Sequence, residues 1–266
     1  MDTLDISVTS LILAFVLLIV PLVINKIYAL GLFKTLANSV ARMSIQLFLV
    51  GIFLKYLFAL NNAVINILWL AIMTFIAVYS VLRNSSMRSS KIFLSIFVSF
   101  SFSTFIIVIY LNSIVVRLDY IFDARYLIVL GGMLLGNSLR GNIVGINSFY
   151  QNIKKDKKTF HYTLSLGASL HEALLPYLRE SVRLALKPTL ASMATMGIVA
   201  LPGMMTGVIL GGTSPSVAVK YQIMIMIAIL AGTTLSIILT ILMTLRICFT
   251  KYGTLRNDIF AEAKSN

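Results

Sequence analysis

Few side chains in the apolar stretches of this 266-residue sequence could do chemistry, and they are amides, thioethers and guanidinium groups rather than acids. Thioether sulfur can bind soft metal ions, although methionine also fills irregular gaps in apolar cores. Charged groups at membrane depth normally face a partner or water, although arginine can also snorkel to the interface. The candidates, which would contact a solute if the apolar stretches enclose a path for one, are Arg42, Gln46, Asn137, Met204, Met205 and Thr206.

Acidic side chains and histidines are absent from these apolar stretches. An acid–base enzyme needs such a group, a proton-driven pump usually buries an acid as a relay, and a hard divalent cation prefers carboxylate oxygens. The two histidines, His161 and His171, lie in one polar segment and form no metal-ligand cluster. The single cysteine, Cys248, rules out an intrachain disulfide. The sequence therefore disfavours an intramembrane enzyme, a proton exchanger and a metal site built from carboxylates.

The composition is that of a multi-pass membrane protein. Hydrophobic residues make up 59% of the chain and charged residues only 12%, against about 25% in soluble domains. The net charge of +13 lies in short segments between apolar runs, as membrane topology requires, so it does not indicate a nucleic-acid partner. The first ten residues carry no Lys or Arg, and the first apolar run is therefore expected to be a retained span rather than a signal peptide.

Seven segments reach the roughly 20 apolar residues that cross a bilayer, which predicts an all-α bundle of about seven spans. Basic residues gather in alternate loops, from Lys26 and Lys34 to the run that begins at Lys154 and to Arg246. Positive loops stay in the cytoplasm, so the N-terminus is expected outside and the C-terminus inside. The predicted spans are 7–25, 36–59, 62–82, 92–115, 126–149, 188–211 and 219–246.

Glycines spaced four residues apart mark the fifth and sixth predicted spans. Small residues at this spacing let membrane helices approach closely, so these spans are expected to form the packed centre of the molecule or of a dimer. Pro202 removes one backbone donor, which is compatible with a kink at a cavity or with a plain packing kink. The glycines predicted to pack are Gly132, Gly136, Gly203, Gly207 and Gly211.

One long polar segment, residues 151–187, separates the fifth and sixth predicted spans. Its leucine spacing predicts a helix, with a turn offered by Gly167, a break at Pro176 and entry into the next span at Pro188. Two interpretations stay open for it, an amphipathic helix on anionic lipid or a docking element for a cytoplasmic partner. No GxxxxGK[ST] motif occurs in the chain, so it has no P-loop of its own for ATP.

Two strings in the second half of the chain resemble the iron-export ABC permease family (FetB/YbbM-like), whose plant members are linked to aluminium tolerance. They are LSLGAS, from Leu164 to Ser169, and GIVALPGMMTGVILGGTSPSVAVKYQI, from Gly197 to Ile223. The likeness is dense over residues 125–230 and looser before them. The family commonly has Gln where this chain has Val208, so a polar group is missing there.

This resemblance implies a single transmembrane permease domain over residues 1–266, with 151–187 as its cytoplasmic coupling loop. The chain would be a homodimer in the plasma membrane (the inner membrane of a bacterium). It would export iron or another metal and would bind a separate ABC ATPase that supplies ATP and Mg²⁺. A stand-alone secondary transporter or channel, or a non-transporting scaffold, remain alternatives. The residues implied to couple to the ATPase are Leu166, Gly167, Ala168, Ser169, Glu172, Arg179 and Arg183.

Overall fold

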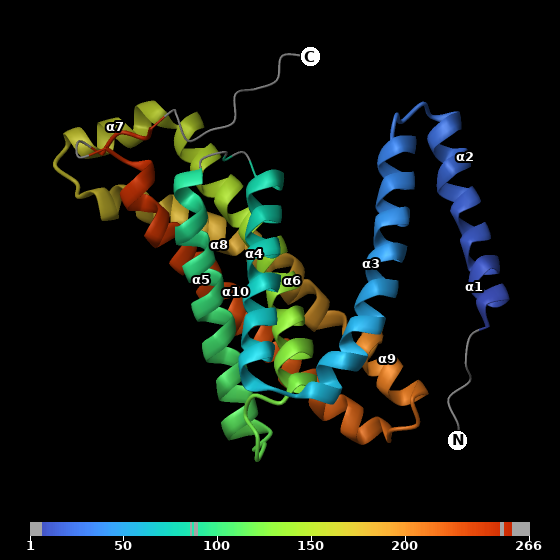
Figure 1. Cartoon of the computed structure of the whole chain (residues 1–266). Helices are drawn as coiled ribbons and strands as arrows, with labels where there is room; N and C mark the ends of the chain where they lie inside the picture. Colours follow the sequence, from blue (N-terminus) through green and yellow to red (C-terminus); the bar gives the residue numbers. More distant parts are fainter. Residues whose placement is uncertain (1–6, 86, 88–89, 251–252, 257–266) are drawn as a thin grey trace.

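The chain forms a bundle of long helices in a computed structural model, which describes residues 7–85, 87, 90–250 and 253–256 (Figure 1). Every regular element within these ranges is a helix, which confirms the predicted all-α class. In chain order they are α1 (Val8–Phe15), a 3₁₀ turn (Val16–Leu18), α2 (Ile19–Ile27), α3 (Phe33–Leu60), α4 (Ala63–Asn84), α5 (Ser90–Tyr110), a π-helical turn (Leu111–Val115), α6 (Ala124–Lys155), α7 (Lys157–Ser165), α8 (Leu170–Thr195), α9 (Gly203–Leu210) and α10 (Pro215–Cys248).

Six helical segments in the described residues are long and apolar enough to cross a membrane, and they correspond to every predicted span except the sixth. α10 runs from the end of the molecule that carries α9 to the end that carries α7 (Figure 1). The predicted position of residues 1–6 falls outside the described residues. The six segments are Thr9–Ile27, Phe33–Leu60, Ala63–Asn84, Ile92–Val115, Ala124–Lys155 and Pro215–Cys248.

The expected span over 188–211 is wrong as a single helix. α8 ends at Thr195, and a turn leads from it to the eight-residue α9, which is too short to cross a bilayer. Gly197 takes a φ of +84°, which favours glycine, and its N–H donates to the carbonyl of Ala200 at 3.0 Å. Pro202 has no N–H and disfavours helix in the residue before it, so α9 starts afresh after it. Hydropathy does not reveal this break, because residues 196–201 are apolar although they are not helical.

Helices α4, α5, α6, α8 and α10 pack around one apolar core. Its largest fully buried side chains include Phe100 of α5, Phe149 of α6 and Ile237 of α10. In Figure 1, α5, α4, α6 and α10 lie side by side, and α8 runs along them from the end that carries α7 toward the end that carries α9. α6 and α10 are the two most central helices. α6 contacts α4, α8 and α10, and α10 contacts α5, α6 and α8.

The glycines of α6 are where this helix meets its neighbours most closely. A Cβ added to Gly131 would lie 2.5 Å from Leu70 Cδ1, and one on Gly132 would lie 3.0 Å from Met73 Cε, both on α4. On another part of α6, a Cβ on Gly141 would lie 2.5 Å from Thr233 Cγ2 of α10, and one on Gly145 would lie 3.0 Å from Ile237 Cγ2. Small residues here permit a close approach of the helices, and an added side chain would force its neighbours to shift.

Three of the glycines predicted to pack face open space within this chain. A Cβ on Gly136, Gly203 or Gly207 would have no heavy atom within 4 Å among the residues considered, and one on Gly211 would meet only the backbone of its own segment, 3.1 Å from the carbonyl oxygen of Gly207. Their close packing against another helix therefore remains a prediction for an assembly of chains.

The N-terminal helices stand apart from the bundle. α1, α2 and α3 are separated from α4 and α6 along most of their length in Figure 1, and α3 has most of its side chains exposed. Its attachment lies at its C-terminal end, where Asn61 donates to Asp123 Oδ2 at 3.1 Å and accepts from the Ala124 N–H at 2.8 Å. Leu57 is buried there with Ala124. Within the described part of the chain, the contacts that attach α3 to the bundle thus lie at its C-terminal end.

Candidate functional site

A polar cavity of about 270 Å³ lies between α6, α8 and α10. It is lined by the middle of α6 and by the part of α8 around its second proline, and α10 contributes Met226. The lining residues are Asn137, Arg140, Gly141, Val144, Ala185, Pro188, Thr189, Ser192 and Met226.

Arg140 supplies the only charge among these lining residues. It lies halfway along the 32-residue α6, about 24 Å from the start of that helix, and its side chain is exposed. Arg183 and Glu180 form an ion pair at 3.5 Å on the exposed surface of α8, and Arg140 takes no part in it. No aspartate or glutamate occurs in the six candidate spans. Arg140 therefore lines the cavity without an acidic partner from the described part of the chain.

The remaining polar side chains of the cavity are one amide and two hydroxyls, which can both donate and accept. Asn137 uses one N–H to bond the carbonyl of Met133 at 2.8 Å, and its amide carries a second. The hydroxyl of Ser192 donates to the carbonyl of Pro188 at 3.0 Å. Pro188 cannot donate to the carbonyl one turn earlier in α8, which leaves a break in the backbone ladder at the cavity wall.

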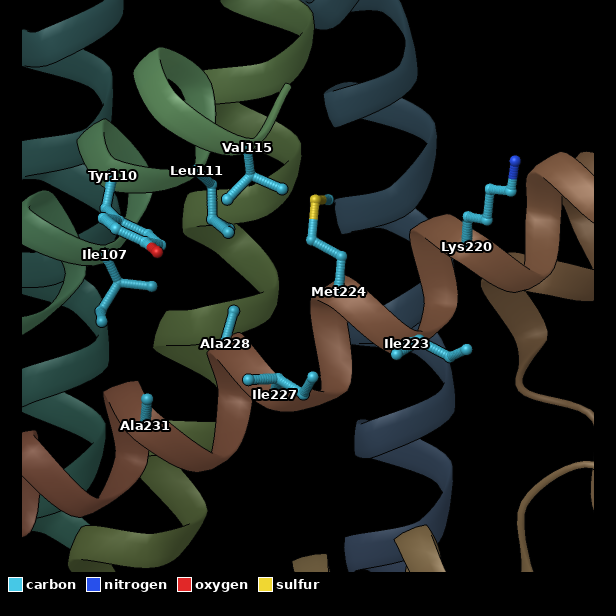
Figure 2. A pocket seen from close by; sticks show the side chains of 10 residues that line it. All are labelled: Ile107, Tyr110, Leu111, Val115, Lys220, Ile223, Met224, Ile227, Ala228 and Ala231. Atoms are coloured by element: carbon cyan, nitrogen blue, oxygen red, sulfur yellow. The ribbon is translucent and has the colours of Figure 1, made fainter. Parts of the chain in front are cut away.

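Two other cavities in the described chain are apolar. Figure 2 shows the first, a groove of about 420 Å³ between α5 with its π-helical turn and α10. Lys220 lies at its edge with its amino group pointing away from the other side chains, and Tyr110 lies at the opposite side (Figure 2). The second, about 460 Å³, lies between α1 and α3 and has an aliphatic and aromatic lining with one hydroxyl, from Ser44. Both suit lipid chains rather than a charged solute.

A buried polar seam joins α6 to α10 beside the polar cavity. Asn142 donates to Ser236 Oγ at 2.9 Å, and the hydroxyl of Tyr150 donates to Thr244 Oγ1 at 2.7 Å. Asn142 Oδ1 and the hydroxyls of Thr233 and Thr240 are buried with no hydrogen-bond partner in the described structure. This seam could have been predicted from the sequence, because hydroxyl residues recur every three or four positions along α10. The prediction of helix packing used the glycine spacing alone. Such bonds hold membrane helices together.

The cavity contains one of the six residues predicted to contact the solute, Asn137. Arg42 and Gln46 lie exposed on α3, away from it. Met204, Met205 and Thr206 are half-buried on α9, and the Thr206 hydroxyl donates to the carbonyl of Pro202 at 3.1 Å. The methionines therefore do not share one continuous helical face with those at the end of α8. A path role for these five residues stays a prediction.

Five of the seven residues implied to couple to an ATPase, Leu166, Gly167, Ala168, Ser169 and Glu172, lie at the turn between α7 and α8 or in the first turn of α8. Gly167 takes a φ of +92° there, which favours glycine, and Leu166 is 70% exposed. Ser169 and Glu172 form a capping box: the Ser169 N–H donates to Glu172 Oε2 at 2.8 Å, and the Glu172 N–H donates to Ser169 Oγ at 3.3 Å. Ala168 is half-buried, and Arg179 and Arg183 are exposed further along α8.

This capping box moves the break in the segment away from Pro176, where it was expected. α8 runs through both Pro176 and Pro188. The proline rings are exposed, and each costs a backbone hydrogen bond, but the strong N-cap at Ser169 fixes the start of the helix seven residues earlier. The interruption therefore lies at residues 166–169, between two helices rather than within one.

Acidification is expected to loosen the start of α8. The hydroxyl and the backbone N–H of Ser169 hold the pKa of Glu172 below its ordinary value of 4.5. The carboxylate therefore contributes stability above pH 4.5, and the contribution is lost as the pH falls through the lowered pKa. Hydrogen exchange of the amides of residues 169–173, corrected for its intrinsic pH dependence, will accelerate in that interval. The variant Ser169→Ala lacks the partner and should show no step, so an undiminished step would argue against the cap.

The α7–α8 turn is tied to the end of α10 by aromatic packing. Phe160 of α7 is 1% exposed, and its ring centroid lies 6.0 Å from that of Phe249 and 6.2 Å from that of Tyr177. Gly253 lies beside Leu164, since a Cβ on it would be 3.2 Å from Leu164 Cδ1. A displacement of the turn would therefore be passed to α8 and α10, both of which line the polar cavity.

These features define a multi-pass membrane protein with a polar cavity among its central helices and a structured basic element at one end. The sequence model of the Uncharacterised protein family (UPF0014) matches residues 8–249, and the chain belongs to this family.

Relatives in several organisms match the chain over most of its length. It is 33% identical over 246 residues to the probable iron export permease protein FetB of Escherichia coli K12, which is 92% of this chain and 93% of the relative. It is 30% identical over 251 residues to Protein ALUMINUM SENSITIVE 3 of Arabidopsis thaliana, 93% of this chain and 89% of the relative. It is 28% identical over 250 residues to the UPF0014 membrane protein YjkA of Bacillus subtilis, 94% and 98% of the two chains. No solved structure gives a significant match. The resemblance inferred from the two sequence strings is thereby confirmed.

Proposed function

We propose that this chain is the membrane-embedded permease subunit of an ATP-driven exporter of a metal ion, with iron as the first candidate. The observation that carries the proposal is the polar cavity among apolar helices, linked through α8 to an exposed turn at the basic end of the bundle. The likeness to a relative named a probable iron export permease supports the substrate class.

A cytoplasmic ABC ATPase is the proposed partner, and the α7–α8 turn is its proposed docking site. Leu166 and Tyr162 are 70% and 64% exposed, and exposed apolar side chains of this kind serve as anchors in protein interfaces. Lys157 and Lys158 flank them on α7. The ATPase would contribute ATP and Mg²⁺, and Phe160 would carry its movement into α8 and α10.

The proposed topology has seven crossings, with α8 and α9 together forming the sixth. The ends of α2, α4, α6 and α10 carry basic residues in their last turns, and these ends lie on the same side of the molecule as α7 (Figure 1). The positive-inside rule supports placing that side in the cytoplasm, with the start of α1 outside. Broken helices are tolerated at membrane depth where they line a cavity or are covered by protein.

The direct test is purification of the chain, co-expressed with a candidate P-loop ATPase, followed by measurement of ATP hydrolysis with and without iron, supplied both as ferrous iron and as a ferric chelate. Co-purification with iron-stimulated hydrolysis is the expected result. Iron transport that persists after ATP depletion and follows an ion gradient would favour a secondary transporter instead. A bound partner with no flux of any metal would favour a scaffold.

A homodimer is proposed as the working assembly, and Gly207→Leu tests whether α9 takes part in it. Gly207 faces open space within the chain, so a leucine should leave folding and insertion intact. If a second copy packs against α9, the variant will elute as a monomer and lose transport, because small residues are needed for close helix approach. Size-exclusion chromatography with light scattering reads the assembly. A variant with wild-type mass and flux would remove Gly207 from the interface.

A further inference from the structure

The cavity between α6, α8 and α10 offers positive charge and hydrogen-bond donors but no acid. Arg140 provides a guanidinium group, and Asn137, Thr189 and Ser192 provide an amide and two hydroxyls. Asp, Glu, His and Cys are missing from the residues that line it. Across the described chain there is likewise no cluster of three or more such residues that could hold a metal ion.

This chemistry is the opposite of what a bare metal cation needs. Divalent iron is held in proteins by imidazole, carboxylate or thiolate ligands, and a guanidinium group repels it. Met226 provides one thioether, which is a ligand for soft rather than hard cations. A bare dication would therefore enter the cavity against its charge and find a single weak ligand.

An anion would meet complementary groups at the same place. Guanidinium is planar and binds carboxylate or phosphate oxygens through two parallel hydrogen bonds. Arg140 has no acidic partner among the described residues, and a charge at this depth requires a counter-ion or water. The second N–H of the Asn137 amide and the hydroxyl of Thr189 can donate to further oxygens of the same ligand.

We infer that the cavity binds its cargo as a multiply charged oxyanion, namely a metal ion already chelated by carboxylate or phosphate groups, an inference that rests on the proposed export of a metal. The volume of about 270 Å³ is close to the roughly 300 Å³ at which small-molecule pockets begin, so it fits a small chelate. Arg140 holds the outer oxygens of the chelator, and the chelator supplies the metal ligands that the protein lacks. The apolar groove of Figure 2 is no substitute, because the amino group of Lys220 points away from it.

Binding to the purified full-length chain in lipid nanodiscs tests this without any ATPase. Equilibrium dialysis with radioactive iron compares ferric citrate, ferric pyrophosphate and ferrous iron kept reduced with ascorbate. The wild-type chain should bind at least one ferric chelate tenfold or more tightly than ferrous iron, and the matching iron-free anion should compete. The preference between citrate and pyrophosphate separates a carboxylate chelator from a phosphate one.

Arg140→Gln should weaken binding of the preferred chelate about tenfold or more, as expected for the loss of a charged hydrogen-bonding partner. Arg140→Lys keeps the charge without the planar guanidinium group. Its affinity for the chelate should lie between those of the wild type and Arg140→Gln. Arg83→Gln, which removes an exposed arginine at the end of α4, is the matched control and should bind as the wild type does. If Arg140→Gln does not fold, the inference is tested by the affinity of Arg140→Lys for the chelate and by competition of the iron-free anion for the wild-type chain.

Three results would overturn the inference: ferrous iron binding as tightly as the chelates, no binding of either chelate, or wild-type binding by Arg140→Gln. The outcome is separable from that of the proposed function. A chain that binds the chelate but no ATPase keeps the anion site and loses the ATP-driven mechanism. A chain whose ATPase activity responds to ferrous iron alone keeps the mechanism and loses the anion site.

Discussion

Replacing Gly141 with leucine is expected to destabilise the bundle severely. Even the first added carbon would lie 2.5 Å from Thr233 Cγ2 and 3.2 Å from Ile237 Cδ1, so α6 and α10 must separate. Overpacking of this kind costs about 1–3 kcal/mol and sometimes more, and here it also strains the buried seam around Asn142 and Ser236. The apparent Tm in detergent should fall by roughly 5–10 °C, with loss of the polar cavity that Gly141 lines.

Gly136→Leu is the matched control on the same helix. A Cβ on Gly136 has no neighbouring heavy atom within 4 Å, and both substitutions gain the same helix propensity over glycine. Its apparent Tm should therefore equal or exceed that of the wild type. Equal Tm values for the two leucine variants would contradict the close approach of α6 and α10. A lower oligomeric mass for Gly136→Leu, at an unchanged Tm, would instead locate Gly136 at a contact between copies.

Hydropathy alone predicted six of the long helices, because the apolar length needed to cross a membrane is a property of each segment and does not depend on its neighbours. A run of about 20 apolar residues leaves the backbone no other way to satisfy its hydrogen bonds in lipid. The same reasoning failed for 188–211, where Gly197 and Pro202 interrupt an apolar run. The break depends on backbone conformation, whereas hydropathy depends on side chains only.

The cavity could be predicted only in part, because it depends on which helix faces meet. Asn137 was found because an amide inside an apolar span is conspicuous. Thr189 and Ser192 were not predicted, because they follow the polar segment 151–187 and hydroxyl residues so close to it do not indicate a site. Glycine spacing likewise indicated close packing on α6, but a neighbour's position decides whether a glycine such as Gly136 meets anything.

Replacing Leu166 with aspartate is expected to weaken binding of the proposed ATPase strongly while the permease itself stays folded. Leu166 is 70% exposed at the turn that follows α7, so no buried contact is lost, and surface changes of this type alter stability by about 0.5 kcal/mol or less. An apolar anchor at the centre of an interface contributes about 2 kcal/mol or more. The affinity should therefore fall about thirtyfold or more, as measured by co-purification and by binding of the isolated ATPase to nanodisc-embedded permease.

Leu166→Met, which keeps a large apolar side chain at the same position, is the control and should retain the complex. Phe160→Ala separates docking from transmission: the turn keeps its exposed leucine but loses the aromatic contact with Phe249, so the ATPase should bind and hydrolyse ATP without driving transport. Wild-type affinity in Leu166→Asp would move the docking site away from the turn, and the exposed basic face with Arg179 and Arg183 would become the next surface to mutate. If the wild-type permease itself binds no ATPase, the structured turn needs another partner, and ATP-independent flux through the Arg140 cavity becomes the better explanation of the bundle.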